Sequence, residues 1–403
     1  MIEMRFKIAL FLLLSLGLQA QEWQTDSDYI NNLNTITTAV PFLTISPDAR
    51  AGSMGEVGAA TTADIHSLHW NPAKLAFLQD QSGLAMSYTP WLSQLVPDIS
   101  LAYLTGYKKI NTNSTLSAAL RYFSLGTIQF TDENASDLGS WSPNEYTFDI
   151  GYGMKFNNNF SGGVAMRYIY SNLTGGQNVG ELETEPGTAF AVDLSAYYES
   201  DFIEKNQWAL GMNISNVGTK ISYTADDIRD FLPMNLKVGG RYTRNIDQYN
   251  SFSVSFDINK LLVPTPPVYA IDSLSGGPAE DENGNYIIEA GRDPNVSVIS
   301  GLFQSFGDAP GGLSEEWREL MYSVGFEYWY QNQFAFRGGY FHEHATKGNR
   351  KYFTLGAGLK MNVFALDFAY LITASPDVKS PLENTMRFGL IFDIGAFTAS
   401  ATE

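Results

Sequence analysis

Segments recur along this chain in which every second residue is apolar and often aromatic. In the stretch MYSVGFEYWY, residues Tyr322, Val324 and Phe326 occupy one set of alternate positions, and Gly325 and Glu327 occupy the other. Successive side chains of a β-strand point to opposite faces, so such a strand has one apolar face and one small or charged face. This alternation predicts β-strands that meet an apolar medium on one side.

We find fourteen segments of this kind, and most have the roughly ten residues that a tilted strand needs to cross a bilayer. An even number of strands is what a closed bacterial barrel requires. We therefore predict an all-β fold, a 14-stranded antiparallel transmembrane β-barrel. The predicted strands are residues 83–90, 97–107, 114–124, 145–156, 160–171, 188–199, 207–216, 234–244, 250–259, 319–330, 333–343, 351–361, 363–372 and 385–394.

The connections between these segments alternate in length. Short turns at residues 157–159, 245–249, 331–332 and 362 alternate with long polar stretches, of which residues 261–318 are the longest. Bacterial outer-membrane barrels have short periplasmic turns and longer external loops. A soluble sandwich or propeller needs neither this sorting nor a lipid-like face on nearly every strand. The pattern indicates a multi-pass outer-membrane barrel.

Charged residues of the predicted strands fall on the face opposite the apolar one. An Arg at the bilayer midplane on the lipid face destabilises a barrel by about 2–4 kcal/mol. The placement of the charged residues on the other face therefore defines the register of each strand. These residues are Arg121, Arg167, Asp193, Asp257, Glu327, Arg337, Asp367, Arg387 and Asp393.

The start of the chain has the pattern of an export signal. Arg5 and Lys7 precede an apolar run from Ile8 to Leu18, and a small-residue cleavage pattern ends at Ala20. That run is too short for a spanning helix. We expect residues 1–20 to be a signal peptide, 21–47 an N-terminal extension, 48–81 a lumen plug, and 82–403 the barrel.

Composition excludes several kinds of protein. The chain has no cysteine, which removes disulfide scaffolds, thiolate catalysis and most structural zinc sites. Its net charge is −18, so a non-specific nucleic-acid role is not expected, because phosphate binding depends on clustered Lys and Arg. We expect no cofactor.

The stretch DARAGSMGEVGAATTADIHSLHWNPAKLAF, residues 48–77, is rich in Gly and Ala and has too little hydrophobic mass to fold alone. A 14-stranded barrel has an interior too wide for its own side chains to fill. Small residues allow close backbone approach to a barrel wall. Asn71 followed by Pro72 predicts an N-cap and first turn of a short helix. We expect this segment to plug the barrel.

The fuller string TTAVPFLTISPDARAGSMGEVGAATTADIHSLHWNPAKLAF resembles the plug of FadL-like outer-membrane barrels and, more closely, the PorV family of the type IX protein secretion system of Bacteroidota. PorQ, a sister barrel, shares parts of the pattern. We take as the plug motif Asp48, Arg50, Gly52, Met54, Gly55, Asp64, Trp70, Asn71 and Pro72. Asp48, Arg50 and Asp64 are candidates for a polar network inside the plug.

The resemblance implies a barrel that transports nothing through its own pore. Members of this family bind the C-terminal β-sandwich signal domain of cargo, take it from the translocon SprA (Sov) and deliver it to the sortase PorU, with PorQ and PorZ nearby. The implied partners are these proteins, cargo signal domains and outer-membrane lipid. The alternative implied by the wider superfamily is a FadL-like channel for uptake of hydrophobic solutes.

The acidic loop at residues 261–317 is far longer than most connections, and such loops are usually functional or disordered. It contains apolar residues at helical spacing, which predict an apolar stripe. The stripe either packs as a lid on its own barrel or meets the translocon or cargo. The candidate partner-binding residues are Val298, Ile299, Leu302, Phe303 and Phe306.

Two histidine pairs, His66 with His69 and His342 with His344, are the remaining candidates for metal ligands or catalytic bases. Imidazole pairs can ligate metal, but no third and fourth ligand is identified, so we expect packing or rim roles and no metal. Lipid hydrolysis would need a nucleophile beside a His base, and no G-x-S-x-G or comparable motif adjoins them. We therefore expect no catalytic site.

Overall fold

The computed structural model describes residues 33–92, 96, 98–131, 137–176, 184–224, 229–273, 276–374 and 380–394. The chain divides into residues 1–34 and residues 35–403, and every element discussed below belongs to the second unit. The predicted signal peptide, residues 1–20, lies outside the described residues. No described helix is long and apolar enough to cross a membrane.

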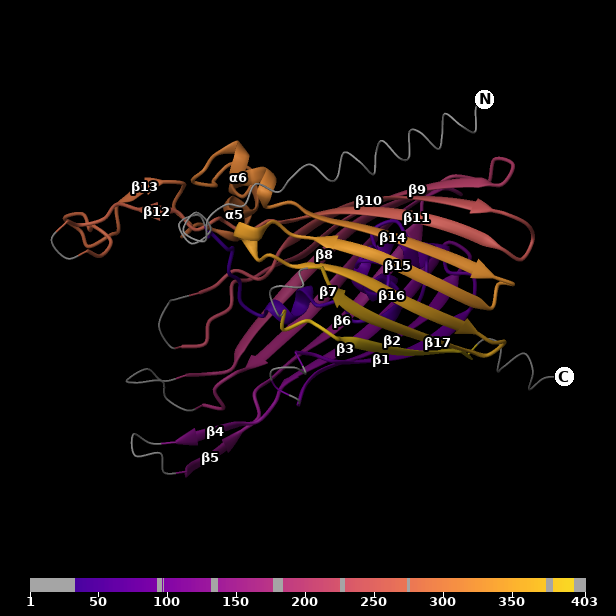
Figure 1. Cartoon of the computed structure of the whole chain (residues 1–403), viewed down its shortest axis with the longest axis horizontal. Coiled ribbons are helices and arrows are strands. Elements are labelled where there is room, and N and C mark those ends of the chain that lie inside the picture. Colours follow the sequence, from indigo (N-terminus) through magenta and orange to yellow (C-terminus); the bar gives the residue numbers. More distant parts are fainter. Residues whose placement is uncertain are drawn as a thin grey trace. The chain divides into compact units, whose positions relative to one another are not determined.

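The long strands close into one antiparallel barrel (Figure 1). Its order is β1-β18-β17-β16-β15-β14-β11-β10-β9-β8-β7-β6-β3-β2, which confirms the predicted 14-stranded architecture. Each predicted segment overlaps one barrel strand. The strands are β1 Ser82–Pro90, β2 Ile99–Asn111, β3 Ser114–Leu125, β6 Asn144–Lys155, β7 Phe160–Asn172, β8 Gly187–Glu199, β9 Asn206–Gly218, β10 Asn235–Asn245, β11 Ser251–Leu261, β14 Met321–Tyr330, β15 Phe334–His342, β16 Lys351–Lys360, β17 Phe364–Thr373 and β18 Met386–Asp393.

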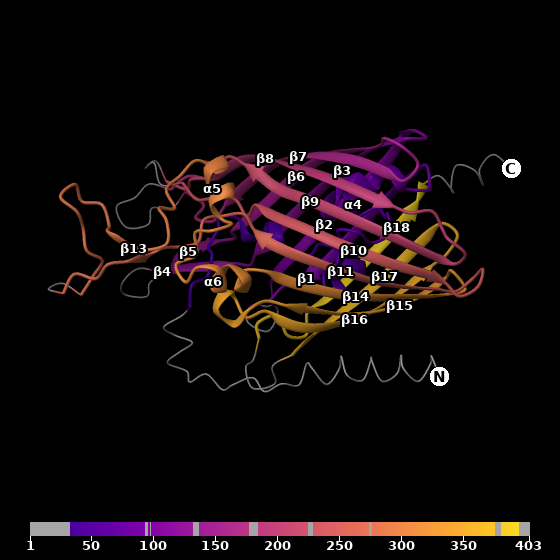
Figure 2. The same cartoon turned by 90° about the horizontal axis from the view of Figure 1, so that it is seen from above.

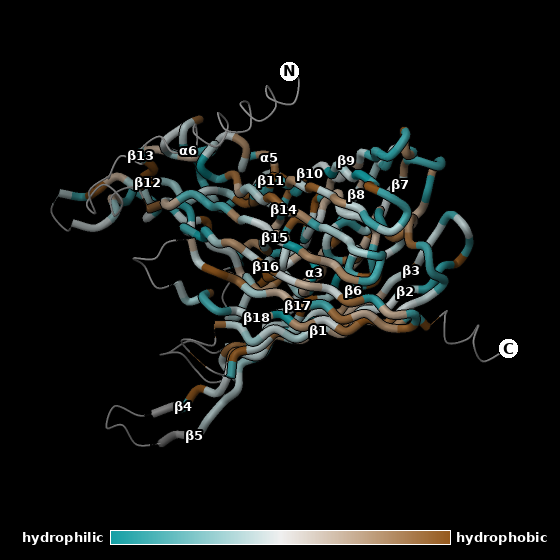
Figure 3. Tube along the Cα trace, turned by 45° about the vertical axis from the view of Figure 1, so that its right-hand side comes forward, coloured by the Kyte–Doolittle hydropathy of each residue, from teal (hydrophilic) through white to brown (hydrophobic). Residues whose placement is uncertain are grey.

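The two faces of the wall differ in exposure as the alternation predicts, and the hydropathy of successive residues varies along the strands (Figure 3). On β14, Phe326 is 47 % exposed and the neighbouring Glu327 is 4 % exposed. On β18, Met386 and Phe388 point outward while Arg387 is buried in the lumen. Exposed Phe and Leu side chains on the outside are stable in lipid, where closure of the sheet also satisfies every backbone hydrogen bond.

The long connections lie at one end of the barrel and the short turns at the other (Figures 1 and 2). Two small hairpins project from the long connections, β4 Ile128–Thr131 with β5 Asp137–Trp141, and β12 Val268–Tyr269 with β13 Ile288–Ala290. The longest connection also carries α5 Val298–Gln304 and α6 Leu313–Arg318. A 3-10 turn, η3 Ala345–Lys347, follows β15 on the same side.

The segment before β1 runs through the lumen. Its first turn, η1 Pro41–Thr44, packs near the long-loop end, where Phe42 stacks on Phe123 with ring centroids 5.8 Å apart. Two short α-helices follow, α3 Ala49–Gly52 and α4 Ser67–Trp70, and then the 3-10 helix η2 Pro72–Phe77. At the short-turn end the Ser161 hydroxyl donates to the Ala73 carbonyl at 2.7 Å. The plug therefore spans the lumen lengthwise.

Glycines of the barrel wall make room for the plug backbone. A Cβ added to Gly211 would lie 1.9 Å from the Ala59 carbonyl oxygen, and one added to Gly339 would lie 2.1 Å from the Met54 carbonyl carbon. The sequence argument placed the small residues in the plug alone. The structure shows that the wall supplies them as well, on the inward face of the strands.

We predict that Gly339→Ala unseats the plug and destabilises the barrel by at least about 2 kcal/mol, because overpacking against backbone cannot be relieved by a rotamer change. The neighbouring Gly338→Ala is the matched control, because its Cβ would point outward with its nearest neighbour at 3.7 Å. Thermal unfolding in detergent, followed by the heat-dependent gel shift of folded barrels, measures both. Equal unfolding temperatures would contradict the close-approach account.

Candidate functional site

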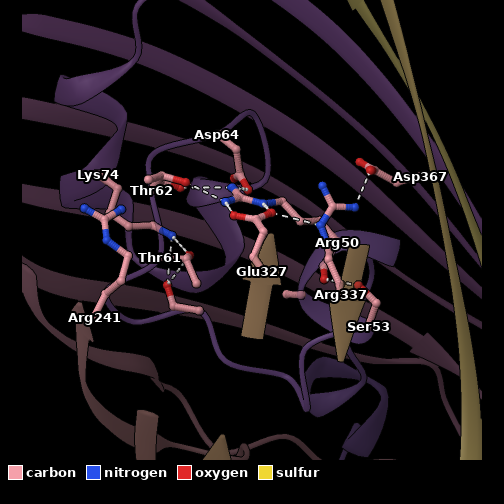
Figure 4. Close-up of polar contacts among 12 residues, drawn as sticks. Arg50, Ser53, Thr61, Thr62, Asp64, Lys74, Arg241, Glu327, Arg337 and Asp367 are labelled. Carbon is pink, nitrogen blue, oxygen red and sulfur yellow. Dashed lines mark hydrogen bonds and ion pairs between the residues drawn. The ribbon is translucent and has the colours of Figure 1, made fainter. Parts of the chain in front are cut away.

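The plug is pinned to the wall by a chain of ion pairs that begins at Arg50 (Figure 4). Its guanidinium donates to the two carboxylate oxygens of Glu327 on β14 at 3.0 and 2.8 Å, and to Asp64 of the plug at 2.6 Å. Glu327 also accepts from Arg337 on β15 at 2.9 Å, and Arg337 reaches Asp367 on β17 at 2.5 Å. Five buried charges of both signs thus connect the plug to three strands.

Asp48 and Trp70 form a second contact that holds the plug in its own fold. The Asp48 carboxylate caps α3 by accepting from the Ala51 amide at 2.8 Å, and it accepts from the Trp70 indole N–H at 2.6 Å. Of the three residues proposed for one polar network, Arg50 and Asp64 are paired directly. Asp48 instead joins two helices of the plug.

Asn71 and Pro72 start η2 as the sequence predicts, with a 3-10 geometry. The Asn71 side-chain oxygen accepts from the Ala73 amide at 3.1 Å, and Pro72 occupies the first turn. The Asn71 amide nitrogen donates to the Ala59 carbonyl at 2.8 Å and to the Ala196 carbonyl of β8 at 3.1 Å. One side chain therefore caps a helix, closes the plug and contacts the wall.

Gly52, Met54 and Gly55 form a close passage of the plug along the wall. A Cβ on Gly52 would lie 2.8 Å from the Arg387 Cδ, and Gly55 has a φ of 65°, which suits glycine. The Gly55 amide donates to the Thr354 hydroxyl on β16 at 2.8 Å. All nine residues of the predicted plug motif therefore lie in the lumen, where they order the plug or contact the wall.

Three further plug contacts were not predicted from the sequence. Glu56 pairs with Arg387 at 3.1 Å, and the Asp257 carboxylate accepts from the amides of Gly58 and Ala59 at 2.6 and 3.0 Å. Lys74 is fully buried and donates to the Gly58 carbonyl at 2.8 Å. A lysine within the apolar run AKLAF is the signal that could have identified this last contact.

The histidines take part in packing and hydrogen bonds. The His69 Nδ1 lies 2.6 Å from the Arg121 guanidinium, and its ring packs edge-on against Trp70. His342 Nδ1 faces the Tyr340 hydroxyl at 3.2 Å, and His344 Nδ1 accepts from the Thr346 amide at 3.2 Å. Among the described residues, no three His, Asp or Glu side chains are grouped to hold a metal ion.

The predicted apolar stripe of the long loop is divided into two rows on α5. Val298 and Leu302 pack against the barrel rim beside the buried Leu262 and Val263. Ile299, Phe303 and Phe306 are exposed by 58, 70 and 50 %. The interpretation as a single stripe was wrong. Val298 and Leu302, four residues apart, form one row that the rim covers, and Ile299 and Phe303 form an adjacent row that it leaves exposed. The covered row packs as a lid on the barrel, and contact of the exposed row with the translocon or cargo stays a prediction.

Buried ion pairs anchor α6 to the rim. Lys260, at the end of β11, contacts Glu316 at 3.0 Å and Glu319 at 2.5 Å. Lys347, in η3, contacts Glu315 at 2.5 Å and Glu319 at 3.1 Å. Two lysines and three carboxylates therefore connect the loop to β11 and to the connection after β15, which gives α5 a fixed base.

Above the plug, the lumen keeps a cavity of about 310 Å³. Its wall includes the Asn213 amide, the Lys237 ammonium and the Trp70 ring, and rim residues such as Glu343 and Arg350 line its upper part. The Lys237 ammonium lies 4.6 Å from the centre of the Trp70 ring. These polar and charged groups share the lining with apolar side chains such as Leu43 and Phe341.

Comparison with known families decides which kind of barrel this is. The family model described as "Type IX secretion system protein PorV" matches residues 28–268, which include the whole described plug and the strands through β11. This chain belongs to the PorV family. The match ends before α5 and α6, so these two helices lie outside the part that the family model covers. No curated protein matches the chain.

Several solved structures are similar to this chain at low sequence identity. They include the Pseudomonas putida toluene transporter TodX, with 11 % identity, a TM-score of 0.49 and coverage of 89 % of this chain and 98 % of that one. The Ralstonia pickettii toluene transporter TbuX has 11 % identity, a TM-score of 0.47 and coverage of 86 % of this chain and 97 % of that one. A Pseudomonas aeruginosa FadL homologue has 11 % identity, a TM-score of 0.43 and coverage of 89 % of this chain and 99 % of that one. These similarities concern barrel architecture alone.

We predict that Arg50→Met destabilises this PorV-family barrel by about 3–5 kcal/mol, because it leaves Asp64 and part of Glu327 buried without their cation. Arg244→Met is the control, since Arg244 is exposed at the short-turn end of β10 and its loss should change stability by about 0.5 kcal/mol or less. Denaturant unfolding in detergent measures both. Similar losses for the two variants would show that the Arg50 network does not hold the plug.

We predict that docking of the rim loop depends on pH through Asp308. Burial, together with Glu316 and Glu319, raises the pKa of Asp308 to about 6. The folded carboxyl thus binds its proton more tightly than an unfolded Asp, whose pKa is about 3.9. The contribution of Asp308 to docking is therefore fully present below about pH 4 and is lost as pH rises through 6.

Asp308→Asn keeps an oxygen for the Thr265 amide, which donates to Asp308 at 3.1 Å, and removes the charge. The measurement is the rate of loop proteolysis in this variant divided by the rate in the parent at the same pH. This ratio should fall severalfold from pH 5 to pH 8. A ratio that stays constant over this range would contradict the assignment.

Proposed function

We propose that this outer-membrane component of the type IX secretion system is a docking protein for cargo handover. It binds the C-terminal signal domain of cargo, receives the cargo from the SprA (Sov) translocon, and passes it to the attachment complex that contains PorU, with PorQ and PorZ nearby. The observation that carries the proposal is a lumen filled by an ion-paired plug together with an exposed apolar row on an anchored external loop.

A firmly held plug favours a role outside the pore. Removing the plug would break the contacts of Arg50, Glu56 and Asn71 with the wall, and would leave buried charges without partners. Such a plug supports a barrel that serves as a rigid membrane scaffold. Its work is then done by surfaces that other proteins can reach, by contact and without a catalytic step.

The exposed row of α5 is the proposed contact surface. Ile299 and Phe303 stand one turn apart, and each exposes more than half of its surface, which is unusual for large apolar residues outside the bilayer. Aromatic and aliphatic anchors of this kind dominate protein interfaces when a partner covers them. The row fits a groove or strand edge on the translocon or on the cargo signal domain.

The alternative is FadL-like uptake of hydrophobic solutes, and it needs an apolar track through the lumen. The described lumen face instead carries Arg121, and it carries Arg167 and Arg337 with the carboxylates that pair with these two. If the handover proposal is right, deletion of the protein leaves growth on long-chain fatty acids unchanged and stops secretion of proteins with C-terminal signal domains. The opposite pattern would favour uptake.

We predict that Phe303→Asp combined with Ile299→Asp reduces secretion of such cargo at least tenfold, because charge in the exposed row disrupts an apolar interface. Ile271→Asp is the matched control, since Ile271 is 74 % exposed on the same loop and lies outside α5. The readout is cargo in the medium against a constant level of folded barrel. Normal secretion, also after deletion of residues 276–312, would exclude this loop as the contact.

A further inference from the structure

Helix α6 turns its two glutamates toward the rim and exposes its large apolar side chains. Glu315 and Glu316 point to the rim lysines, with side chains exposed by 13 and 10 %. Leu313 and Trp317, one turn apart on the other side, are exposed by 77 and 68 %. A helix surrounded by water on its outer side has the reverse arrangement. The outer side of α6 therefore suits an apolar surrounding.

The position of α6 shows which surrounding that is. Along β11, Asp257 and Asn259 are buried in the lumen, so Ile258 and Lys260 point outward, and it is Lys260 that pairs with α6. In Figures 1 and 2 the helix lies beside the end of β11 at the long-loop side. Helix α6 thus lies against the outer face of the wall, at its upper edge.

A crevice joins this helix to the lipid-facing surface of the barrel. It has a volume of about 360 Å³ and is lined mostly by apolar side chains. Val238 and Ile258 belong to the outward face of β10 and β11, and Leu313, Trp317 and Phe306 come from the loop. The apolar surface is therefore continuous from the membrane wall to the helix.

We propose that α6 is an interfacial anchor whose Leu313 and Trp317 insert into the outer leaflet of the membrane, with lipid acyl chains in the crevice. Tryptophan is enriched at the membrane–water interface because its ring is apolar and its N–H is polar, and barrels carry aromatic girdles at this level. The ion pairs of Lys260 and Lys347 neutralise the charged side of the helix, and the Lys260–Glu316 pair borders the crevice. This proposal does not depend on the handover function.

The anchor has a consequence for the rest of the loop. Because α6 is held at the membrane surface and α5 packs on the rim through Val298 and Leu302, the exposed row of α5 lies on a support that is fixed on two sides. Lipid then contacts α6 and Phe306, and a partner contacts Ile299 and Phe303 of the same connection.

Spin-label accessibility tests the proposal, and the chain suits it because it has no cysteine of its own. Single variants Trp317→Cys and Leu313→Cys are labelled in the full-length barrel, reconstituted in vesicles of phosphatidylethanolamine and phosphatidylglycerol. Val238→Cys is the lipid reference and Phe303→Cys is the water reference. Collision with oxygen reports lipid, and collision with a water-soluble nickel chelate reports water.

The anchor predicts that labels at 313 and 317 collide with oxygen as often as the label at 238, and severalfold less with nickel than the label at 303. Nickel accessibility equal to that at 303 would place α6 in water and overturn the proposal. Protection from both reagents would show that protein covers the helix, and this too would overturn it. The heat-dependent gel shift confirms that each labelled barrel is folded.

Discussion

A polypeptide that crosses a bilayer as strands has no water with which to pair its N–H and C=O groups, so its sheet must close on itself. Every other feature of this PorV-family barrel follows from that closure. Fourteen strands enclose a lumen that wall side chains alone do not fill, and the alternation that satisfies the lipid on one face places small and charged residues on the other. The plug occupies the space inside the barrel, and it pairs with charged residues on the inner face of the wall.

The pairing is shared between plug and wall. Glu327 lies between Arg50 of the plug and Arg337 of the wall, so the plug completes a network that the wall begins. By contrast, Arg167 finds Asp149 and Asp193 within the wall itself. The lumen therefore contains one set of charges that stabilises the barrel and another that recognises the plug. This division explains how a segment with little hydrophobic mass is held firmly in place.

Much of the fold could be predicted from the sequence, because strand number, register and the sorting of turns depend on local alternation and turn residues. The helix start at Asn71 and Pro72 was predictable for the same reason. The partners of Glu56, Lys74 and Asp257 were not, because they join segments that are distant in the sequence. The two rows of α5 were also missed. Helical spacing shows which residues share a side, and only the rim shows which row is covered.

The long loop that carries α5 has apolar residues that pack on the barrel rim and others that stay exposed. Val298 and Leu302 of α5 pack on the rim, and Ile299 and Phe303 remain exposed. Buried lysine–carboxylate pairs keep this arrangement rigid, so an interface built on it would not have to order the loop on binding. A rigid, plugged scaffold with a presented apolar row is the physical basis of the proposed handover.

The central claim is that the protein works through partners and not through its pore. Mass spectrometry of what co-purifies with the tagged, full-length barrel, extracted in mild detergent from its native outer membrane, tests it most directly. The account predicts recovery of a very large barrel, a sortase-like protein and cargo with C-terminal β-sandwich signals. Recovery of the barrel alone, with fatty acid or another hydrophobic solute bound in its lumen, would contradict it.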